Sequence, residues 1–364
     1  MRPAWHEIRV KLPLRRSHSC QNMRRLSSSS IFNTSPVRWA QSSPARDSPP
    51  PLQPLMRQTP FNLPRNSHEP RSTFFCENQA LSPMSPTPLP SVFIDTAESL
   101  SDFLDELTGD ANLQSTTPSL FVDIEGIDLS RHGSVSLLTI FYLPTKTTYL
   151  LDVTTLAAST FSTPSSTDAG VTLRSIFESP RILKVFFDVR NDSDALFAHF
   201  SVALAGVVDL QLLELGSRKG GLARKRLANG LAQCIKYHAS LTLEEKEAWG
   251  AIKERGRGLF APEKGGSYEV FDERPLAEEI RAYCVQDVQF LPGLWKLYTE
   301  RLGDSQDWAR MIEEETRARV ILSQNADYIS DSKDRALGPW VPKEEKEKKK
   351  GREVNNEGEK LGDA

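Results

Sequence analysis

Short apolar runs separated by turn residues are the main feature of the middle of the chain. Residues 119–126 (SLFVDIEG), 134–142 (SVSLLTIFY) and 147–153 (TTYLLDV) are rich in β-branched and aromatic side chains, with RHG and PTK between them. This pattern predicts three sequential antiparallel strands. Two later runs, 182–188 (ILKVFFD) and 206–210 (GVVDL), each predict one more strand.

Helical segments alternate with the later strands. We expect helices at 171–179 and 191–200, and a longer helical segment at 275–302, where apolar positions recur at spacings of three and four. Pro275 suits the first turn of that segment, and Pro292 is expected to kink or divide it. The succession of strands and helices predicts an α/β unit with a mixed sheet.

The two ends of the chain differ in composition from the centre. Residues 1–90 are rich in Ser, Pro and Arg and show no period of 2 or 3.6, so we expect a disordered basic arm. One domain is expected at 91–303, a helical extension at 304–331 and a disordered charged tail at 332–364. The first fifty residues, rich in Arg and Ser and poor in acids, also have the composition of a mitochondrial transit peptide, so both interpretations of this arm stay open.

Composition excludes a membrane-spanning protein and a cysteine-based framework. The mean hydropathy is −0.42, and no uninterrupted apolar run reaches the roughly 18 residues that a membrane span needs. The four cysteines are scattered and form no CxxC or Cys/His pattern, which indicates neither a zinc site nor disulfides. We therefore expect a reducing intracellular compartment, the nucleus or cytoplasm, with the mitochondrion as the alternative.

The net charge of −3 is unevenly distributed. Up to Phe75 the chain has 12 Lys and Arg against 3 Asp and Glu, a charge of +9, which leaves −12 for the remainder. A protein that holds nucleic acid by charge alone would carry the opposite sign there. The acidity of the central domain therefore needs another explanation.

Two acidic side chains interrupt the first strand. Asp123 and Glu125 alternate with apolar Val122 and Ile124, so the pleat places both carboxylates on one face. Two like charges that share a face repel, and a hard divalent cation such as Mg²⁺ or Mn²⁺, which prefers oxygen ligands, relieves the repulsion. The alternative is that both residues merely end an exposed strand.

Two further elements carry candidate groups. Asp192 begins the helix that follows 182–188, although acids also cap helix N-termini for purely structural reasons. Tyr283 and Asp287 are spaced i and i+4 on the last helical segment, which places phenol and carboxylate on one face. A tyrosine in such a place is also common in a hydrophobic core.

Taken in order, these elements resemble the DEDDy exonucleases of the ribonuclease D type, and most of all the eukaryotic 3′-5′ exonuclease domain-containing, Egalitarian-like branch. The resemblance covers roughly residues 90 to 302. It rests on four segments: FVDIEG (121–126), KVFFDVRNDSDALF (184–197), VVDLQLLE (207–214) and RPLAEEIRAYCVQDVQFLPGLW (274–295). It implies a ribonuclease H-like fold with a five-stranded mixed sheet flanked by helices.

The resemblance also implies a set of site residues. Two Mg²⁺ or Mn²⁺ ions would be held by four carboxylates: Asp123, Glu125, Asp192 and Asp287. Tyr283 would orient the attacking water, and 5′-mononucleotides would leave one at a time from the 3′ end of single-stranded RNA or DNA. Neutralisation by metal then accounts for part of the acidity. Protein partners are not predicted by the sequence.

The chain departs from the ribonuclease D pattern at one point. Phe187 and Asp188 stand where that family usually has His followed by a small residue. Asp192 is preferred as the ligand because it matches the helical acid of the family, eight residues after Lys184. A contribution of Asp188 to the metal site, as a fifth carboxylate, stays open.

The sequence leaves open how the substrate is contacted and whether the domain is catalytic. Residues 217–226 (SRKGGLARKR) and 253–266 (KERGRGLFAPEKGG) place Lys and Arg beside Gly and Phe260, which suits phosphate contact and base stacking, but also a solvated loop. A catalytically inactive nucleic-acid-binding or adaptor module is the alternative to an enzyme. Because all four acids and the tyrosine are present, we favour the enzyme.

Overall fold

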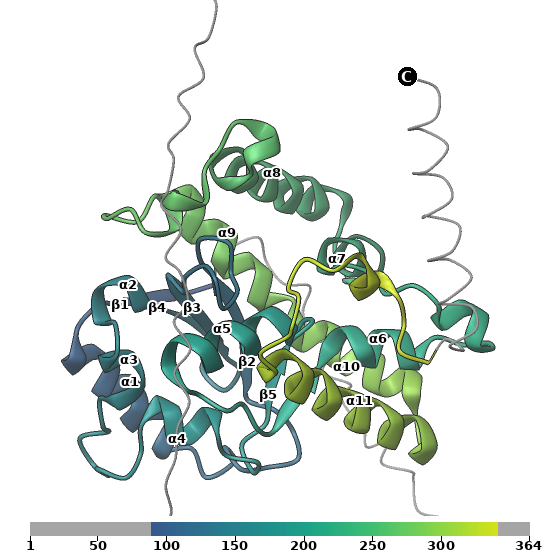
Figure 1. The fold of residues 1–364 in the computed structure, drawn as a ribbon, viewed down its shortest axis with the longest axis horizontal. Helices are drawn as coiled ribbons and strands as arrows, with labels where there is room; N and C mark the ends of the chain where they lie inside the picture. Colours follow the sequence, from purple (N-terminus) through teal and green to yellow (C-terminus); the bar gives the residue numbers. More distant parts are fainter. Residues whose placement is uncertain (1–88, 341–364) are drawn as a thin grey trace, which may run out of the picture. The chain divides into compact units, whose positions relative to one another are not determined.

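The computed structural model describes residues 89–340 (Figure 1). The predictions for the basic arm or transit peptide lie outside the described residues, and so does the charged tail from 341 onward. Among the described residues, no helix combines the length and the apolar character needed to cross a bilayer.

A six-stranded mixed sheet forms the centre of the domain, in the order β1-β4-β3-β2-β5-β6. The strands are β1 (Ser91–Ile94), β2 (Leu120–Glu125), β3 (Leu137–Tyr142), β4 (Thr147–Asp152), β5 (Lys184–Phe186) and β6 (Val207–Asp209). β2, β3 and β4 pair antiparallel, whereas β5 runs parallel to β2 and β6 runs parallel to β5. The predicted α/β class and ribonuclease H-like arrangement are therefore confirmed.

The sheet has one strand more than the five that were predicted. The additional strand, β1, pairs in parallel with β4, Ser91 lying opposite Thr148 and Ile94 opposite Leu151. β1 has only four residues and follows a Pro-rich stretch, and only Ile94 within it is buried. Such a short edge strand carries no resolvable period of 2, and its pairing depends on residues more than fifty positions away.

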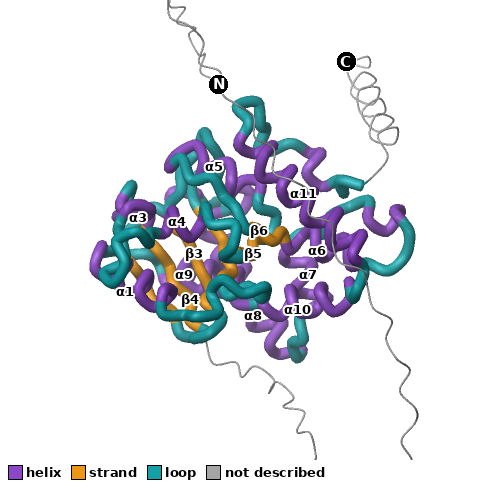
Figure 2. Tube along the Cα trace, turned by 90° about the horizontal axis from the view of Figure 1, so that it is seen from below, coloured by secondary structure: helices purple, strands orange, loops and turns teal. Residues whose placement is uncertain are grey.

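Helices pack on both faces of the sheet. They are α1 (Ala97–Thr108), α2 (Val153–Leu156), α3 (Ser159–Ser162), α4 (Leu173–Phe177), α5 (Arg190–Phe200), α6 (Leu210–Ser217), α7 (Leu231–His238), α8 (Leu243–Phe260), α9 (Glu278–Gln289), α10 (Leu291–Leu302) and α11 (Gln306–Gln324). Figure 2 shows α1, α3 and α4 gathered at one end of the sheet and α6, α7 and α10 at the other. The long final helical segment is divided at Pro292, as predicted, because α9 ends at Gln289 and α10 begins at Leu291.

Alternation along β2 separates two cores. Val122 and Ile124 point into a hydrophobic cluster with α1, α4 and α5, whereas Phe121 points into a second cluster with α6 and α10. Asp123 and Glu125 share the face of Phe121 because side chains alternate along a strand. α9 packs against β2, β3 and β4 on that face. The carboxylates of β2 thus face a helix rather than solvent alone.

The packed part of the chain extends further than the sequence indicated. The charged tail was expected from residue 332, but the structure describes a 3-10 turn, η4 (Lys333–Ala336), and continues to Trp340. Leu337 forms a β-bridge with Leu227, and the ring of Trp340 lies edge-on to Trp308 at 5.0 Å. These anchors come from distant segments, so the local composition of the tail gave no sign of them.

Candidate active site

Three predicted carboxylates converge at the contact between β2 and α9. One carboxylate oxygen from each of Asp123, Glu125 and Asp287 lies within 4.8 Å of the others. Asp123 and Glu125 are half-buried, and Asp287 is buried, with 4% of its surface exposed. The i and i+4 spacing places Tyr283 on the same face of α9, one turn before Asp287. Residues 164 positions apart in the chain therefore meet at one point, as the resemblance implied.

Asp192 lies outside this tight group but within its electrostatic reach. It occupies the first turn of α5, with 8% of its surface exposed. Burial raises the pKa of its carboxyl well above the ordinary value, and the charge of Asp123 raises that pKa further. The charge of Asp192 in turn raises the pKa of Glu125. Asp192 is thus coupled electrostatically to the two acids of β2, although only the other three ligands form the compact cluster.

The grouped carboxylates resist full ionisation. Burial and the charge of Asp287 raise the pKa of Asp123 to about 7, and burial and the charge of Asp123 raise the pKa of Glu125 well above its usual value. Lys253 of α8 opposes this effect, because its Nζ lies 2.9 Å from both Oδ1 and Oδ2 of Asp287. An all-oxygen cluster with more acids than its one contacting ammonium fits a hard divalent cation.

Tyr283 belongs both to this site and to a core. It is 8% exposed, its ring lies 5.0 Å from that of Phe260 in an edge-on arrangement, and Lys253 Nζ lies 4.7 Å from its centroid. Burial, followed by the charge of Asp287, raises the pKa of its phenol above the ordinary value. The hydroxyl therefore stays protonated at neutral pH and can donate a hydrogen bond, whereas it cannot act as a base.

Lys253 is a site residue whose position sequence reasoning missed. It begins the segment 253–266 that was expected to hold phosphate or to be solvated, yet its ammonium is bound to Asp287. Phe260 of the same segment packs between Tyr268, at 5.9 Å, and Phe271, at 5.2 Å, within an intramolecular cluster. No local pattern would have linked Lys253 to an acid 34 residues later.

The basic segment 217–226 also uses its charges internally. Lys225 is 2% exposed, and its Nζ donates to the backbone carbonyls of Gly216, at 2.6 Å, and of Arg218. Arg218 forms a two-bond ion pair with Glu214, at 2.9 and 2.5 Å. These two cations stabilise the loop after α6, and neither the phosphate-binding nor the solvated-loop interpretation describes them.

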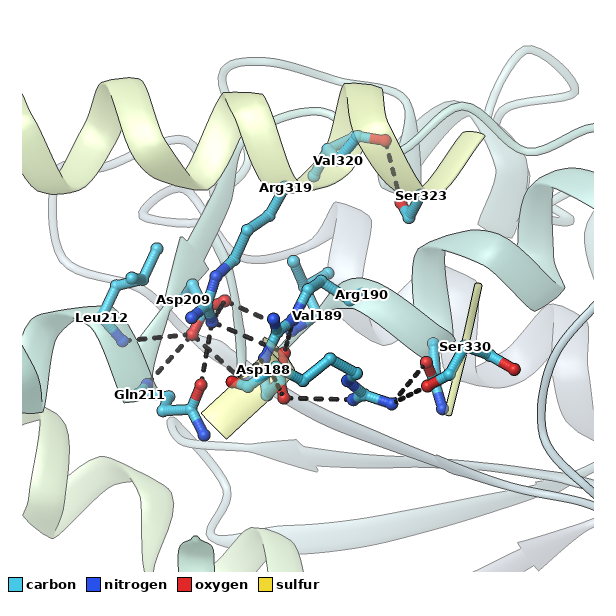
Figure 3. A network of polar contacts seen from close by, with 12 residues as sticks. Asp188, Val189, Arg190, Asp209, Gln211, Leu212, Arg319, Val320, Ser323 and Ser330 are labelled. Atoms are coloured by element: carbon cyan, nitrogen blue, oxygen red, sulfur yellow. Dashed lines mark hydrogen bonds and ion pairs between the residues drawn. The ribbon is translucent and has the colours of Figure 1, made fainter. Parts of the chain in front are cut away.

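Asp188 belongs to a different charge network, drawn in Figure 3. Its two carboxylate oxygens accept from Arg190 at 2.6 and 2.8 Å, and the guanidinium of Arg335 lies 3.1 Å away. Burial alone would raise the pKa of Asp188, but Arg190, Arg319 and Arg335 outweigh it and lower that pKa. A negative charge compensated by three arginines has no need of a metal ion. The fifth-carboxylate interpretation therefore loses its basis.

One cysteine, Cys234, lies beside two other potential metal ligands. Cys234 and His238, spaced i and i+4 on α7, lie close to Glu214 of α6, with one ligand atom from each residue within 4.8 Å of the others. The Cys-x-x-x-His spacing was the signal that could have revealed this pair. Glu214, however, is already bound by Arg218, and the hydroxyl of Tyr298 lies 2.8 Å from His238 Nδ1. Protein contacts thus satisfy this group.

The region that carries this site is similar to known exonucleases. A family model described as 3′-5′ exonuclease matches residues 92–302, more than half of the chain, and this range carries all five predicted site residues. The chain belongs to the 3′-5′ exonuclease family. Membership supports a hydrolytic nuclease, and the family is generally dependent on divalent metal. A search of curated proteins finds no match.

Similar solved structures include RNase D from two organisms. RNase D from Trypanosoma brucei in complex with GMP is 23% identical, with 67% of each chain covered and a TM-score of 0.49. The same enzyme in complex with RNA U12 is 22% identical, with 70% of this chain and 81% of that chain covered and a TM-score of 0.49. Escherichia coli RNase D, an exoribonuclease involved in structured RNA processing, is 16% identical, with 65% and 52% covered and a TM-score of 0.45.

Proposed function

We propose that this protein is a metal-dependent 3′-5′ exonuclease that releases 5′-mononucleotides from the 3′ end of single-stranded RNA or DNA. One observation carries the proposal. Oxygens of Asp123, Glu125 and Asp287 converge within 4.8 Å, from a strand and a helix that are far apart in the chain. Grouping three carboxylates this closely costs stability through their mutual repulsion, and a bound cation would offset that cost.

The site residues divide the work between binding and orientation. Asp123, Glu125, Asp192 and Asp287 would hold two Mg²⁺ or Mn²⁺ ions. When bound, such ions lower the pKa of a water and stabilise charge on the phosphate and leaving oxygens. Burial, followed by repulsion from the neighbouring carboxylates, raises the pKa values of Asp123 and Glu125, and a bound cation would remove the repulsion. Lys253 neutralises part of the same charge through Asp287.

Tyr283 would position the attacking water. Its phenol stays protonated because burial and nearby acids raise its pKa. A protonated hydroxyl can donate a hydrogen bond to a water or to a phosphate oxygen. Its ring contacts that of Phe260 and the ammonium of Lys253, so the hydroxyl has a defined direction. Fixed direction is what a group that aligns a nucleophile needs.

A catalytically inactive nucleic-acid-binding or adaptor module is the second candidate. It shares the fold, and its mark would be the loss of metal-binding acids. All four acids and Tyr283 are present here, and three of the acids are brought together. This favours the enzyme.

The experiment uses the full chain with 5′-labelled single-stranded RNA and DNA of the same sequence. Each substrate is incubated with Mg²⁺, with Mn²⁺ or with EDTA. Asp123→Asn and Asp287→Asn remove one negative charge each without changing side-chain size. Asp304→Asn, at an exposed position outside the carboxylate group, is the matched control.

We expect ladders that shorten from the 3′ end with either metal, and no shortening with EDTA. The two site variants should lose activity on the order of a hundredfold or more, because each removes a group that stabilises transition-state charge. The control should match the wild-type chain. Binding without shortening under every metal condition would instead establish the adaptor.

A further inference from the structure

The first turn of α5, which carries Asp192, is held from outside the region that matches the exonuclease family. The family match ends at residue 302, whereas α11 and the segment that follows it lie beyond that point. We call residues 319–335 the C-terminal clamp. Figure 3 shows Arg319 of α11 and the network around Asp188, Arg190 and Asp209 into which it reaches.

Asp188, two residues before the start of α5, is the first residue that the clamp holds. Arg319 Nη1 lies 3.5 Å from Asp188 Oδ1, and Arg335 Nη2 lies 3.1 Å from Asp188 Oδ2. Arg319 also binds Asp209 Oδ2 at 2.8 Å. Asp209 in turn accepts hydrogen bonds from the backbone N–H groups of Asp188 and Val189, at 3.2 and 3.3 Å. The turn into α5 is thereby bound through side chain and backbone.

The backbone of this turn requires such support. Asp188 has a φ of +65°, in the left-handed region that non-glycine residues rarely adopt. Asp is one of the few residues that tolerate it. The departure from the ribonuclease D pattern at this position thus supplies a carboxylate to the clamp arginines. The cost of the left-handed backbone is offset by ion pairs of Asp188 with Arg190 of α5 and with Arg319 and Arg335 of the C-terminal segment.

The clamp also holds the two residues that precede Asp192 on the helix. Asn191 Oδ1 accepts hydrogen bonds from Tyr328 Oη at 3.0 Å and from Arg335 Nη1 at 2.8 Å. Arg190 Nη2 donates to the backbone carbonyl of Arg335 at 3.0 Å. Both neighbours of Asp192 on its N-terminal side are therefore fixed by side chains or backbone from residues 328–335.

Asp194, two residues after Asp192, is connected to the clamp through Arg131. Asp194 accepts from the backbone N–H and the Nε of Arg131, at 2.8 and 2.7 Å. Arg131 Nη2 donates to the backbone carbonyl of Ser323, within the clamp, at 2.8 Å. The turn of helix that bears Asp192 is thus held on both sides; Asp194 and Arg319 are buried, whereas Arg131, Asp188 and Arg335 are partly buried.

We propose that the C-terminal clamp, acting chiefly through Arg335, positions Asp192 toward the carboxylates of β2 and α9. The inference rests on the proposed function, because a position for Asp192 matters only if Asp192 binds metal. A clamp that merely fastened the C-terminus would not need to bind residues 188, 190 and 191 together. Arg335 contacts all three of them, through side chain or backbone.

The test compares variants of the full chain. Arg335→Met removes the three contacts of the guanidinium, to Asp188, Asn191 and the backbone carbonyl of Ser330, and Arg335→Lys keeps the charge but cannot form the paired geometry. Arg310→Met, at an exposed position on α11 with long ion pairs of 3.8 and 4.0 Å, is the matched control. Asp192→Asn is the reference for a lost ligand. We would measure Mn²⁺ affinity and stoichiometry by calorimetry, kcat and KM on a short oligonucleotide, and Tm.

We expect Arg335→Met to weaken Mn²⁺ binding by roughly 10- to 100-fold and to lower kcat similarly, the range found when a residue that orients a metal ligand is removed. KM should change little, and Arg335→Lys should restore part of both losses. Should Arg335→Met not fold, Tyr328→Phe, which removes only the hydroxyl on Asn191, decides by the same readouts with a smaller expected loss.

Two distinguishable results would refute the proposal. If wild type cleaves and Asp192→Asn does not, but Arg335→Met matches Arg310→Met in Mn²⁺ affinity and kcat, the clamp has no positioning role. If wild type neither binds Mn²⁺ nor cleaves, or if Asp192→Asn behaves as wild type, the assigned metal site itself is wrong and the clamp proposal fails with it.

Discussion

Replacement of Lys253 by Met should lower the stability of the metal-free protein and raise its affinity for metal. Lys253 Nζ bonds to both oxygens of Asp287, and the two side chains are only 15% and 5% exposed. Loss of one partner from a fully buried pair costs about 3–5 kcal/mol. Here the acids can take up a proton in compensation, because the pKa of Asp123 is already raised to about 7. We therefore expect a loss of about 2 kcal/mol at neutral pH.

The free energy that the Lys253–Asp287 pair contributes to stability opposes metal binding, so its loss should favour metal binding by a similar amount. An ion that binds Asp287 must take at least one of the oxygens that Lys253 occupies, so binding to wild type includes the cost of breaking the pair. The Met variant has no pair to break. A difference of about 2 kcal/mol corresponds to an affinity roughly thirtyfold higher for Mn²⁺ or Ca²⁺. A loss of stability together with a gain in metal affinity would distinguish displacement of Lys253 by the ion from general damage to the site.

Calorimetric titration with Mn²⁺ gives the affinity, and urea unfolding in EDTA gives the stability. Lys264→Met is the matched control, since Lys264 pairs with the largely exposed Glu254 and such pairs contribute little. Unchanged or weaker Mn²⁺ binding by Lys253→Met, in a folded protein, would show that the ammonium does not compete for Asp287. It would then be part of the metal-bound site.

Two further predictions follow from the same site. Gly256 of α8 packs so closely on Tyr283 that a Cβ added to Gly256 would lie 2.8 Å from the Cβ of Tyr283. Gly256→Ala should therefore shift the tyrosine ring and reduce kcat by roughly tenfold or more. Gly258→Ala is the control: an added Cβ meets open space there, so kcat should stay unchanged and stability should rise by up to about 1 kcal/mol. Without metal, the free energy of unfolding measured in urea should fall as pH rises through about 7, because the pKa of Asp123 is higher in the folded than in the unfolded state. Mg²⁺ should abolish this fall. A rise in stability over the same pH range would contradict the raised pKa of Asp123.

The sequence predicted which acids come together better than it predicted the elements around them. The period of 2 on β2 placed Asp123 and Glu125 on one face, and the i and i+4 spacing placed Tyr283 with Asp287; the structure brings the three acids together. The strand β1 was missed because four residues at a sheet edge carry too little pattern. The roles of these residues in metal binding and catalysis remain predictions until they are measured.

What the sequence by itself determined is therefore local: which segments form strands and helices, and which side chains of one element share a face. Backbone geometry fixes these relations within a few residues, so they can be counted along the chain. Only the tertiary structure decided that Lys253 binds an acid 34 residues away and that Arg335 binds Asp188 across 147 residues. Such pairs depend on how whole elements pack, because many arginines and acids are chemically equivalent partners until the fold brings two of them together and excludes water from between them.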